Sequence, residues 1–193
     1  ARDILRRLYV KYFIREIYHL ASQAIVRHSL KDPTETYRSN IFGTVNVLES
    51  IRENVVTNQH LLVMSTDKVY GEGLNKEVSD SFNPIDPYST SKVCMELIIE
   101  DYKRHFEISP TVIRSCNIFG FDPYNTTRIV PKTIINLLSG KRPVIYSTSG
   151  ESFRQYIFVN DVVKILTEVI ESGVTHNIGA PFMYTPEELV MLI

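Results

Sequence analysis

The sequence lacks the features that mark several specialised classes of protein. Its 193 residues include only two cysteines, Cys94 and Cys116, and neither these nor the five histidines show the spacing of metal ligands. We therefore expect no metal site and two reduced thiols in a cytoplasmic protein. No apolar run approaches the roughly 18 residues that a membrane-spanning helix needs, so we expect no membrane span.

An excess of charge of either sign is also absent. The formal net charge is −1 at pH 7, which argues against a basic face for nucleic acid. With 44% hydrophobic residues the chain can bury a core. Its length suggests one domain, or one domain and part of another.

Strand-like runs alternate with helical patterns in the first part of the chain. The runs predicted as strands are 16–20, 60–65 and 110–114. Helical periodicity covers 1–12, 33–54 and 88–106. The second strand is apolar on both faces, as in a parallel sheet covered on both sides. This alternation predicts a doubly wound α/β fold.

The pattern changes near Gly120. A helix is predicted over 129–138 and another from Asn160, and the short strands expected between and after them are 143–146, 153–159 and 176–179. We place a domain boundary there. Residues 1–120 form the sheet domain, and residues 121–193 supply elements of a smaller domain that alternate with returns to the first.

The chemistry concentrates between residues 61 and 92. Tyr88 and Lys92 are four apart on a predicted helix and share a face. A neighbouring ammonium lowers the pKa of a phenol, which lets a tyrosine act as a base near neutral pH. A surface Tyr–Lys pair would show the same spacing. However, the preceding strand ends in the polar run 65–68, and ligand sites of open α/β sheets lie at such strand ends.

These segments resemble the extended short-chain dehydrogenase/reductase family, the NAD-dependent nucleotide-sugar epimerases and dehydratases. The matching motifs follow the family's order and span nearly the whole chain: HLAS (19–22), NIFGTVNVLES (40–50), VMSTDKVYG (63–71), PYSTSK (87–92), RSCNIFG (114–120), RIVP (128–131), RPVIYS (142–147), FRQYIFVNDV (153–162) and HNIG (176–179). The resemblance implies a Rossmann-like NAD-binding domain over 1–120 and part of a small α/β substrate domain.

The resemblance also implies NAD as cofactor and a nucleotide-diphosphate sugar as substrate. Tyr88 would take the proton of the sugar 4-hydroxyl, Lys92 would bind the nicotinamide ribose, and Thr66 would hydrogen-bond the 4-oxygen. The other residues implied at the cofactor are Leu20, Ala21, Ser22, Asn40, Ser65 and Cys116. Those implied at the substrate are Gln23, Asn117, Arg128, Tyr146 and Arg154.

The pair Asp67-Lys68 favours a 4,6-dehydratase over a 4-epimerase. Similar epimerases carry small or neutral residues after the threonine, whereas some dehydratases carry Asp-Lys. A protonated Asp67 would protonate the leaving C6 hydroxyl and a neutral Lys68 would take the C5 proton, and burial of the pair would favour these two protonation states. A solvated loop pair in a 4-epimerase is the alternative. The segment 21–40 is most similar to the CDP-glucose 4,6-dehydratases.

One family feature is missing from the sequence. The NAD pyrophosphate of the family lies on a Gly-rich loop, and no G-x-x-G-x-x-G occurs in these 193 residues. Family order puts that loop and about three strands before Ala1. We therefore expect these residues to be part of a longer polypeptide that also has a shorter C-terminal piece. A truncated, non-catalytic nucleotide-sugar-binding protein is the alternative.

The two longest predicted helices suggest a homodimer. The helix 88–106 is apolar on more than one side and so needs a second partner. In the family, helices equivalent to 35–54 and 88–106 form the dimer interface. Burial under another part of the polypeptide is the alternative.

Overall fold

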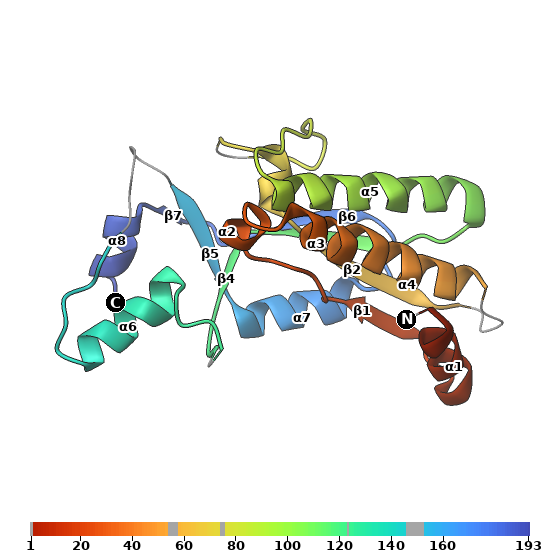
Figure 1. Cartoon of the computed structure of the whole chain (residues 1–193), viewed down its shortest axis with the longest axis horizontal. Helices are drawn as coiled ribbons and strands as arrows, with labels where there is room; N and C mark the ends of the chain where they lie inside the picture. Colours follow the sequence, from red (N-terminus) through yellow and green to blue (C-terminus); the bar gives the residue numbers. More distant parts are fainter. Residues whose placement is uncertain (1, 54–57, 74–75, 123, 146–152) are drawn as a thin grey trace. The chain divides into compact units, whose positions relative to one another are not determined.

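The computed structural model describes residues 2–53, 58–73, 76–122, 124–145 and 153–193. The chain divides into two compact units. Unit 1 consists of Ala1–Ser115 and Leu166–Asn177, and unit 2 of Cys116–Ile165 and Ile178–Ile193. Figure 1 labels the helices and strands of both.

A four-stranded sheet organises unit 1. Its strands, in spatial order, are β1 (Glu16–His19), β2 (His60–Thr66), β3 (Thr111–Ser115) and β6 (Thr175–Ile178). β1 pairs with β2 and β2 with β3 in parallel, and Val63 lies opposite both His19 and Val112. The three strands predicted in this part of the chain and their parallel arrangement are confirmed. Because parallel strands end on the same edge, the residues that end β1, β2 and β3, which are His19, Thr66 and Ser115, share one edge.

The helices of unit 1 follow the predicted pattern, with the short helix α2 (Val26–Ser29) and a π-helical turn as additions. The others are α1 (Arg2–Tyr12), α3 (Pro33–Tyr37), α4 (Gly43–Arg52) and α5 (Pro87–Phe106). Asp32 caps α3 by accepting the Glu35 N–H at 2.9 Å. The predicted single helix over 33–54 contains a π-helical turn, η1 (Arg38–Phe42), between α3 and α4. Such turns widen a helix and are frequent at functional sites.

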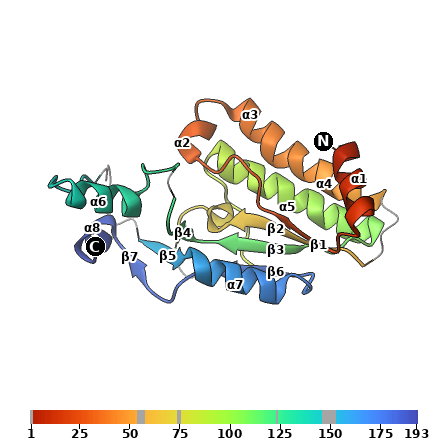
Figure 2. The same cartoon turned by 90° about the horizontal axis from the view of Figure 1, so that it is seen from below.

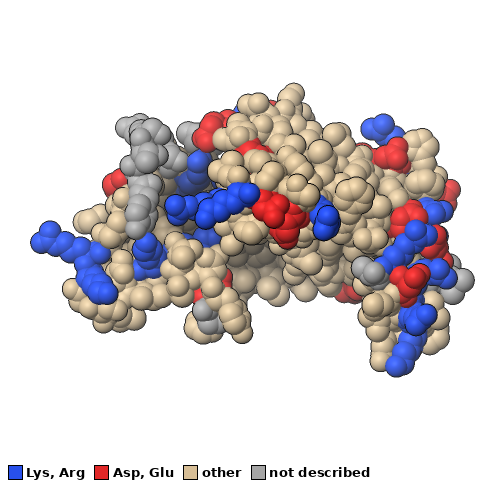
Figure 3. Space-filling model, viewed as in Figure 1, with Lys and Arg blue, Asp and Glu red and all other residues tan. Residues whose placement is uncertain are grey.

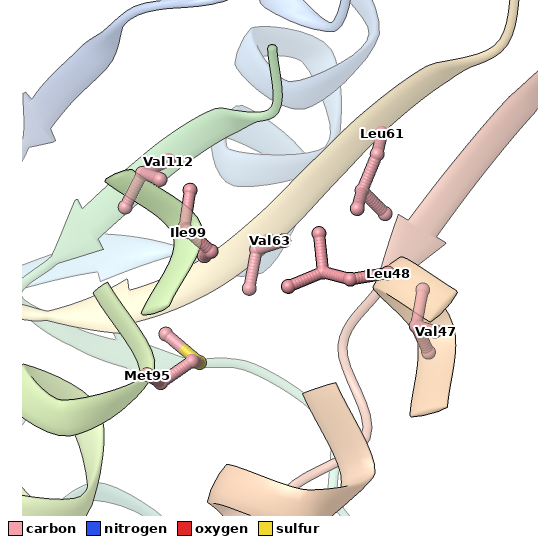
Figure 4. Packing of buried hydrophobic residues seen from close by; sticks show 7 residues of the cluster. All are labelled: Val47, Leu48, Leu61, Val63, Met95, Ile99 and Val112. Carbon is pink, nitrogen blue, oxygen red and sulfur yellow. The ribbon is translucent and has the colours of Figure 1, made fainter. Parts of the chain in front are cut away.

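The core of unit 1 lies where α4 and α5 pack side by side on the sheet (Figures 1 and 2). Figure 4 shows its buried cluster, which comprises Val47, Leu48, Leu61, Val63, Met95, Ile99 and Val112. Burying one such side chain stabilises the fold by about 1.5–3 kcal/mol. The cluster therefore fixes α5, the helix that carries Tyr88 and Lys92, on β2 and β3.

The helix α1 packs against α4. Tyr9 is buried, and Leu5 lies against the core cluster. Arg2 and Arg6 pair with Glu53, and Figure 3 shows acidic and basic side chains intermixed in this region. Exposed ion pairs contribute only about 0–1 kcal/mol each, so the apolar contacts of Tyr9 and Leu5 hold α1 in place.

Unit 2 holds a second, smaller sheet. Its strands are β4 (Asn117–Phe119), β5 (Arg154–Phe158) and β7 (Met183–Tyr184), in which β4 is parallel and β7 antiparallel to β5. Its helices are α6 (Ile129–Leu138) and α8 (Pro186–Met191), and α7 (Val159–Val169) begins in it. The predicted strand over 143–146 is wrong for residues 143–145, which are irregular, and Tyr146 lies outside the described residues. Pro143 has no N–H to donate to a sheet.

Candidate active site

The start of α5 is fixed by a capping box. The Asp86 carboxylate accepts the Ser89 N–H at 2.9 Å, and the Ser89 hydroxyl accepts the Asp86 N–H at 3.2 Å. Pro87 occupies the first helical position, where its missing N–H costs nothing. Tyr88 follows and is buried. Local sequence thus sets the position of Tyr88 in the first helical turn.

Lys92 joins this helix to the end of β2. Its side chain is 3% exposed, and its Nζ donates a hydrogen bond of 2.7 Å to the Met64 carbonyl oxygen. Burial lowers the pKa of Lys92 to about 8, while the negative charge of Glu96 acts in the opposite direction. The structure therefore places a cation with a reduced pKa beside the strand end that precedes the polar run 65–68.

Thr66 organises the residues that follow β2. It caps the short 3-10 helix η2 (Asp67–Tyr70): its hydroxyl accepts the Lys68 N–H at 3.3 Å and donates to the Asp67 carboxylate at 3.1 Å. Thr66 is buried, whereas Asp67 and Lys68 are half-buried. All five residues predicted as catalytic therefore lie in unit 1, on the end of β2, on η2 and on the first turns of α5.

Asn40 is enclosed by the chain itself. Its side chain is 1% exposed; Oδ1 accepts the Gln23 N–H at 2.7 Å, and Nδ2 donates to the Gln23 carbonyl at 3.0 Å and to the Ser91 hydroxyl at 2.8 Å. Asn40 thereby ties the segment after β1 to α5, one residue before Lys92. The expected contact of Asn40 with a cofactor stays a prediction.

The end of β1 combines one enclosed and several accessible residues. The His19 Nε2 lies 3.0 Å from the Thr44 hydroxyl, and burial together with the charge of Lys92 lowers the pKa of His19 to about 4. His19 is therefore neutral near pH 7. Leu20 and Ala21 are exposed and Ser22 is half-buried, which leaves this strand end open to a ligand.

Sequence reasoning did not identify a buried network around Glu96. The Glu96 carboxylate accepts hydrogen bonds from Arg114 Nε at 2.9 Å, from Arg114 Nη2 at 2.7 Å and from the Ser65 hydroxyl. Arg114 Nη1 donates to the Tyr70 hydroxyl at 2.6 Å. The sequence did carry a signal for this network, since Glu96 and Arg114 stand within otherwise apolar helix and strand patterns. Charged residues at such positions are buried only when they are paired, so the pattern indicates an ion pair.

The remaining predicted residues belong to unit 2. Cys116 is buried, and the Asn117 amide donates to the Gln155 carbonyl at 3.3 Å. Arg154 is half-buried on β5, and Arg128 is exposed just before α6. Tyr146 lies outside the described residues. The ligand contacts expected of these residues stay predictions.

Comparison with known proteins decides the family. Residues 1–179 match the model described as the NAD dependent epimerase/dehydratase family. The chain belongs to this family. The predicted resemblance to the nucleotide-sugar epimerases and dehydratases is thereby confirmed.

The relatives that this chain resembles include both 4,6-dehydratases and 4-epimerases. The dTDP-D-glucose 4,6-dehydratase of Dictyostelium discoideum is 30% identical over 196 residues, which cover 93% of this chain and 44% of the relative. The UDP-glucose 4-epimerase of Thermotoga maritima, solved with UDP-glucose, is 27% identical with a TM-score of 0.88 and covers 100% of this chain and 64% of that structure.

A third relative is the dTDP-glucose 4,6-dehydratase of Bacillus anthracis, solved in complex with NAD. It is 25% identical with a TM-score of 0.85, over 99% of this chain and 59% of that structure. These likenesses confirm the Rossmann-like α/β fold. This epimerase/dehydratase chain spans about half the length of the curated relatives it matches.

Proposed function

We propose that this chain carries the acid–base residues of an NAD-dependent nucleotide-sugar 4,6-dehydratase. The observation that carries the proposal is the bond from Lys92 Nζ to the Met64 carbonyl, directly before the run 65–68. It holds the Tyr88–Lys92 helix at the strand end that bears Asp67 and Lys68. The 30% identity to a named 4,6-dehydratase supports the proposal.

The edge of the sheet fits a nicotinamide cofactor. Leu20 is 52% exposed and follows His19, which pairs with Val63, so Leu20 and Ala21 lie level with the end of β2. These two residues would line the cofactor, and the Lys92 ammonium would bind a hydroxyl of the nicotinamide ribose. NAD bound there would supply the hydride acceptor for oxidation at C4 of the sugar and the hydride that reduces C6.

Oxidation at C4 depends on Tyr88 in this proposal. The phenolate of Tyr88 takes the 4-hydroxyl proton, and the neighbouring Lys92 cation stabilises that phenolate. The buried position of Tyr88 keeps water from competing for the proton. The product of this half-reaction is a 4-keto sugar, whose C5 proton is acidic because its carbanion is conjugated with the carbonyl.

Elimination then depends on Asp67 and Lys68. The Lys68 amine takes the C5 proton, and the Asp67 carboxyl gives its proton to the C6 hydroxyl, which leaves as water. The proton returns to C5 as C6 is reduced, so the sugar loses one water overall. Thr66 bonds to the Lys68 amide and to the Asp67 carboxylate, and so presents both residues from one turn.

A 4-epimerase is the second candidate. It is favoured by the structural likeness to the Thermotoga maritima enzyme, and it would use Tyr88 and Lys92 without the acid–base pair. In that case Asp67 and Lys68 would be a solvated pair, which accords with their partial exposure.

The deciding experiment uses protein expressed from its complete reading frame, with NAD and a panel of CDP-, dTDP-, UDP- and GDP-linked hexoses. The named relatives favour dTDP-glucose, whereas the segment 21–40 resembles the CDP-glucose enzymes, so the panel also identifies the base. We expect mass spectrometry to show loss of one water. A product of unchanged mass would establish the epimerase instead.

Replacing the proposed acid gives the sharper test. Asp67→Asn should lower the dehydration rate at least about 100-fold, the lower range for general acid catalysis. Asp80→Asn is a matched control, because Asp80 is an exposed acid in the segment after η2, and within the described residues its carboxylate only accepts the Glu77 N–H. Equal dehydration rates in the two variants would refute the role of Asp67.

The finer statements about partners and location belong to the same proposal. We propose a homodimer through helices 35–54 and 88–106, because Phe42 and Leu97 are 63% and 57% exposed on them. Light scattering that gives the mass of a single chain would refute it.

No helix in the described ranges is long and apolar enough to cross a membrane. The cytoplasmic location stays a prediction that cell fractionation tests.

A further inference from the structure

The network around Glu96 extends from the end of β2 to the loop before α5, and it is buried except at Asn177, which is exposed. We call the side chains Ser65, Glu96, Arg114, Tyr70 and Asn177 the Glu96 network. Ser65 precedes the proposed catalytic run, and Glu96 lies one helical turn after Lys92. The Glu96 and Arg114 side chains are 4% and 7% exposed, so each charge is stabilised by the other and hardly by water.

The other half of the network holds the segment 76–86, which leads into α5. Arg114 Nη1 donates to the Val78 carbonyl at 3.0 Å, and the Asn177 amide donates to the Lys76 carbonyl at 3.0 Å. The Arg114 guanidinium lies 4.9 Å from the centre of the Phe82 ring. Two backbone carbonyls and one aromatic ring of this segment are thus bound by the network.

Tyr70 links the two halves. It is the last residue of η2, the turn that begins with Asp67 and Lys68. Its hydroxyl accepts from Arg114 and donates to the Asn177 side chain at 2.7 Å, and its ring lies 5.0 Å from the guanidinium. Gly71 follows with φ +72°, where a side chain would collide with the Asn83 carbonyl. The chain therefore turns back sharply after η2.

We propose that Tyr70 and Arg114 are positioning residues that fix η2 and the segment 76–86, and so set Asp67 and Lys68 against the Tyr88–Lys92 helix. The proposal rests on the proposed dehydratase function for its catalytic consequence. Neither residue touches the reacting atoms. Their effect is transmitted through Ser65 and η2 on one side and through Val78 and Phe82 on the other.

The first test needs no substrate. Tyr70→Phe keeps the ring but removes the hydroxyl from Arg114 and Asn177. We expect hydrogen exchange of backbone amides in 76–83 to become about fivefold faster, the factor that one hydrogen bond of about 1 kcal/mol represents. The Asn83 N–H, which donates to the Val69 carbonyl at 2.8 Å, is the reporter.

Tyr102→Phe is the matched control. Tyr102 lies on α5, and its hydroxyl also donates one hydrogen bond, to the Glu49 carboxylate at 2.7 Å, outside the Glu96 network. Exchange in 76–83 should not change in this variant. Arg114→Lys is a second test variant, because it keeps the charge beside Glu96 but loses the bonds to Tyr70 and Val78. Unchanged exchange in both Tyr70→Phe and Arg114→Lys would overturn the proposal.

The second test separates positioning from general loss of stability. In Tyr70→Phe we expect elimination to slow about tenfold, since misplacement of acid–base groups is costly. Oxidation at C4 should keep its rate, so the absorbance of reduced nicotinamide should accumulate during turnover. Equal slowing of both half-reactions would overturn the positioning role. A wild-type protein that dehydrates no nucleotide sugar would refute the proposed function, and the exchange experiment would still decide whether the network holds the segment.

Discussion

Two glutamates of unit 1 have the same kinds of hydrogen-bond partner, one arginine and one hydroxyl, but differ in how far they are buried. Glu96 binds the Nε and Nη2 of Arg114 and one hydroxyl, that of Ser65. Glu49 binds the Nε and Nη2 of Arg52, at 2.7 and 2.8 Å, and also accepts one tyrosine hydroxyl.

Burial separates the two groups. The Glu96 and Arg114 side chains are 4% and 7% exposed, whereas Glu49 and Arg52 are 16% and 38% exposed. We call Glu96–Arg114 the inner pair and Glu49–Arg52 the outer pair. Water can replace a lost partner at the outer pair but not at the inner pair. The same contacts therefore hold backbone segments together around Glu96 and contribute little around Glu49.

The largest expected effect comes from breaking the inner pair. Arg114→Met leaves the Glu96 carboxylate buried without its cation, so we expect the free energy of unfolding to fall by about 3–5 kcal/mol. Arg52→Met should lower it far less, because water replaces the partner of so exposed a cation. Urea unfolding of the two variants measures both values, and similar losses would remove the distinction between the pairs.

A compensating variant sharpens this result. Arg114→Met combined with Glu96→Met removes both charges at once, so most of the lost stability should return. If the double variant is as unstable as Arg114→Met alone, then packing of the arginine, not its charge, accounts for the loss.

Lys92, four residues before Glu96, gives an effect that depends on pH. Its pKa in the folded protein is about 8, below the 10.5 of an unfolded chain. Between these values the unfolded chain binds more protons, so the free energy of unfolding should rise as pH rises from about 8 to about 10.5. Lys92→Met should lack this rise. Urea unfolding of both proteins across this range measures the difference, and parallel curves would contradict it.

The smallest effect is expected at the outer pair in acid. The Arg52 hydrogen bonds, followed by that of Tyr102, lower the pKa of Glu49 from 4.5 to about 2. The stabilisation is complete above pH 4.5 and is lost as pH falls toward about 2. Glu49→Gln should therefore lose less stability than the wild type over that interval, by under about 1 kcal/mol for so exposed a pair. A difference between the two proteins that stays unchanged as pH falls from 4.5 to about 2 would point to packing instead.

Local patterns predicted the elements that bear the proposed chemistry. The four-residue spacing of Tyr88 and Lys92 and the apolar run before Ser65 were sufficient to place a helix and a parallel strand. The π turn around Asn40 was not predicted, because its hydrogen bonds shift by one residue without any change in apolar periodicity. The strands β4 and β7, of three and two residues, are too short for a pattern to show.

The sequence by itself determined the order of strands and helices, the capped start of α5 and the family motifs, because these depend on neighbours within a few residues. Only the tertiary structure decided which charges are buried and which partner each one has. Glu96 and Arg114 are 18 residues apart, and Tyr70 and Asn177 are 107 apart. Their pairing depends on how β2, β3 and α5 pack, and burial then decides the strength of each bond.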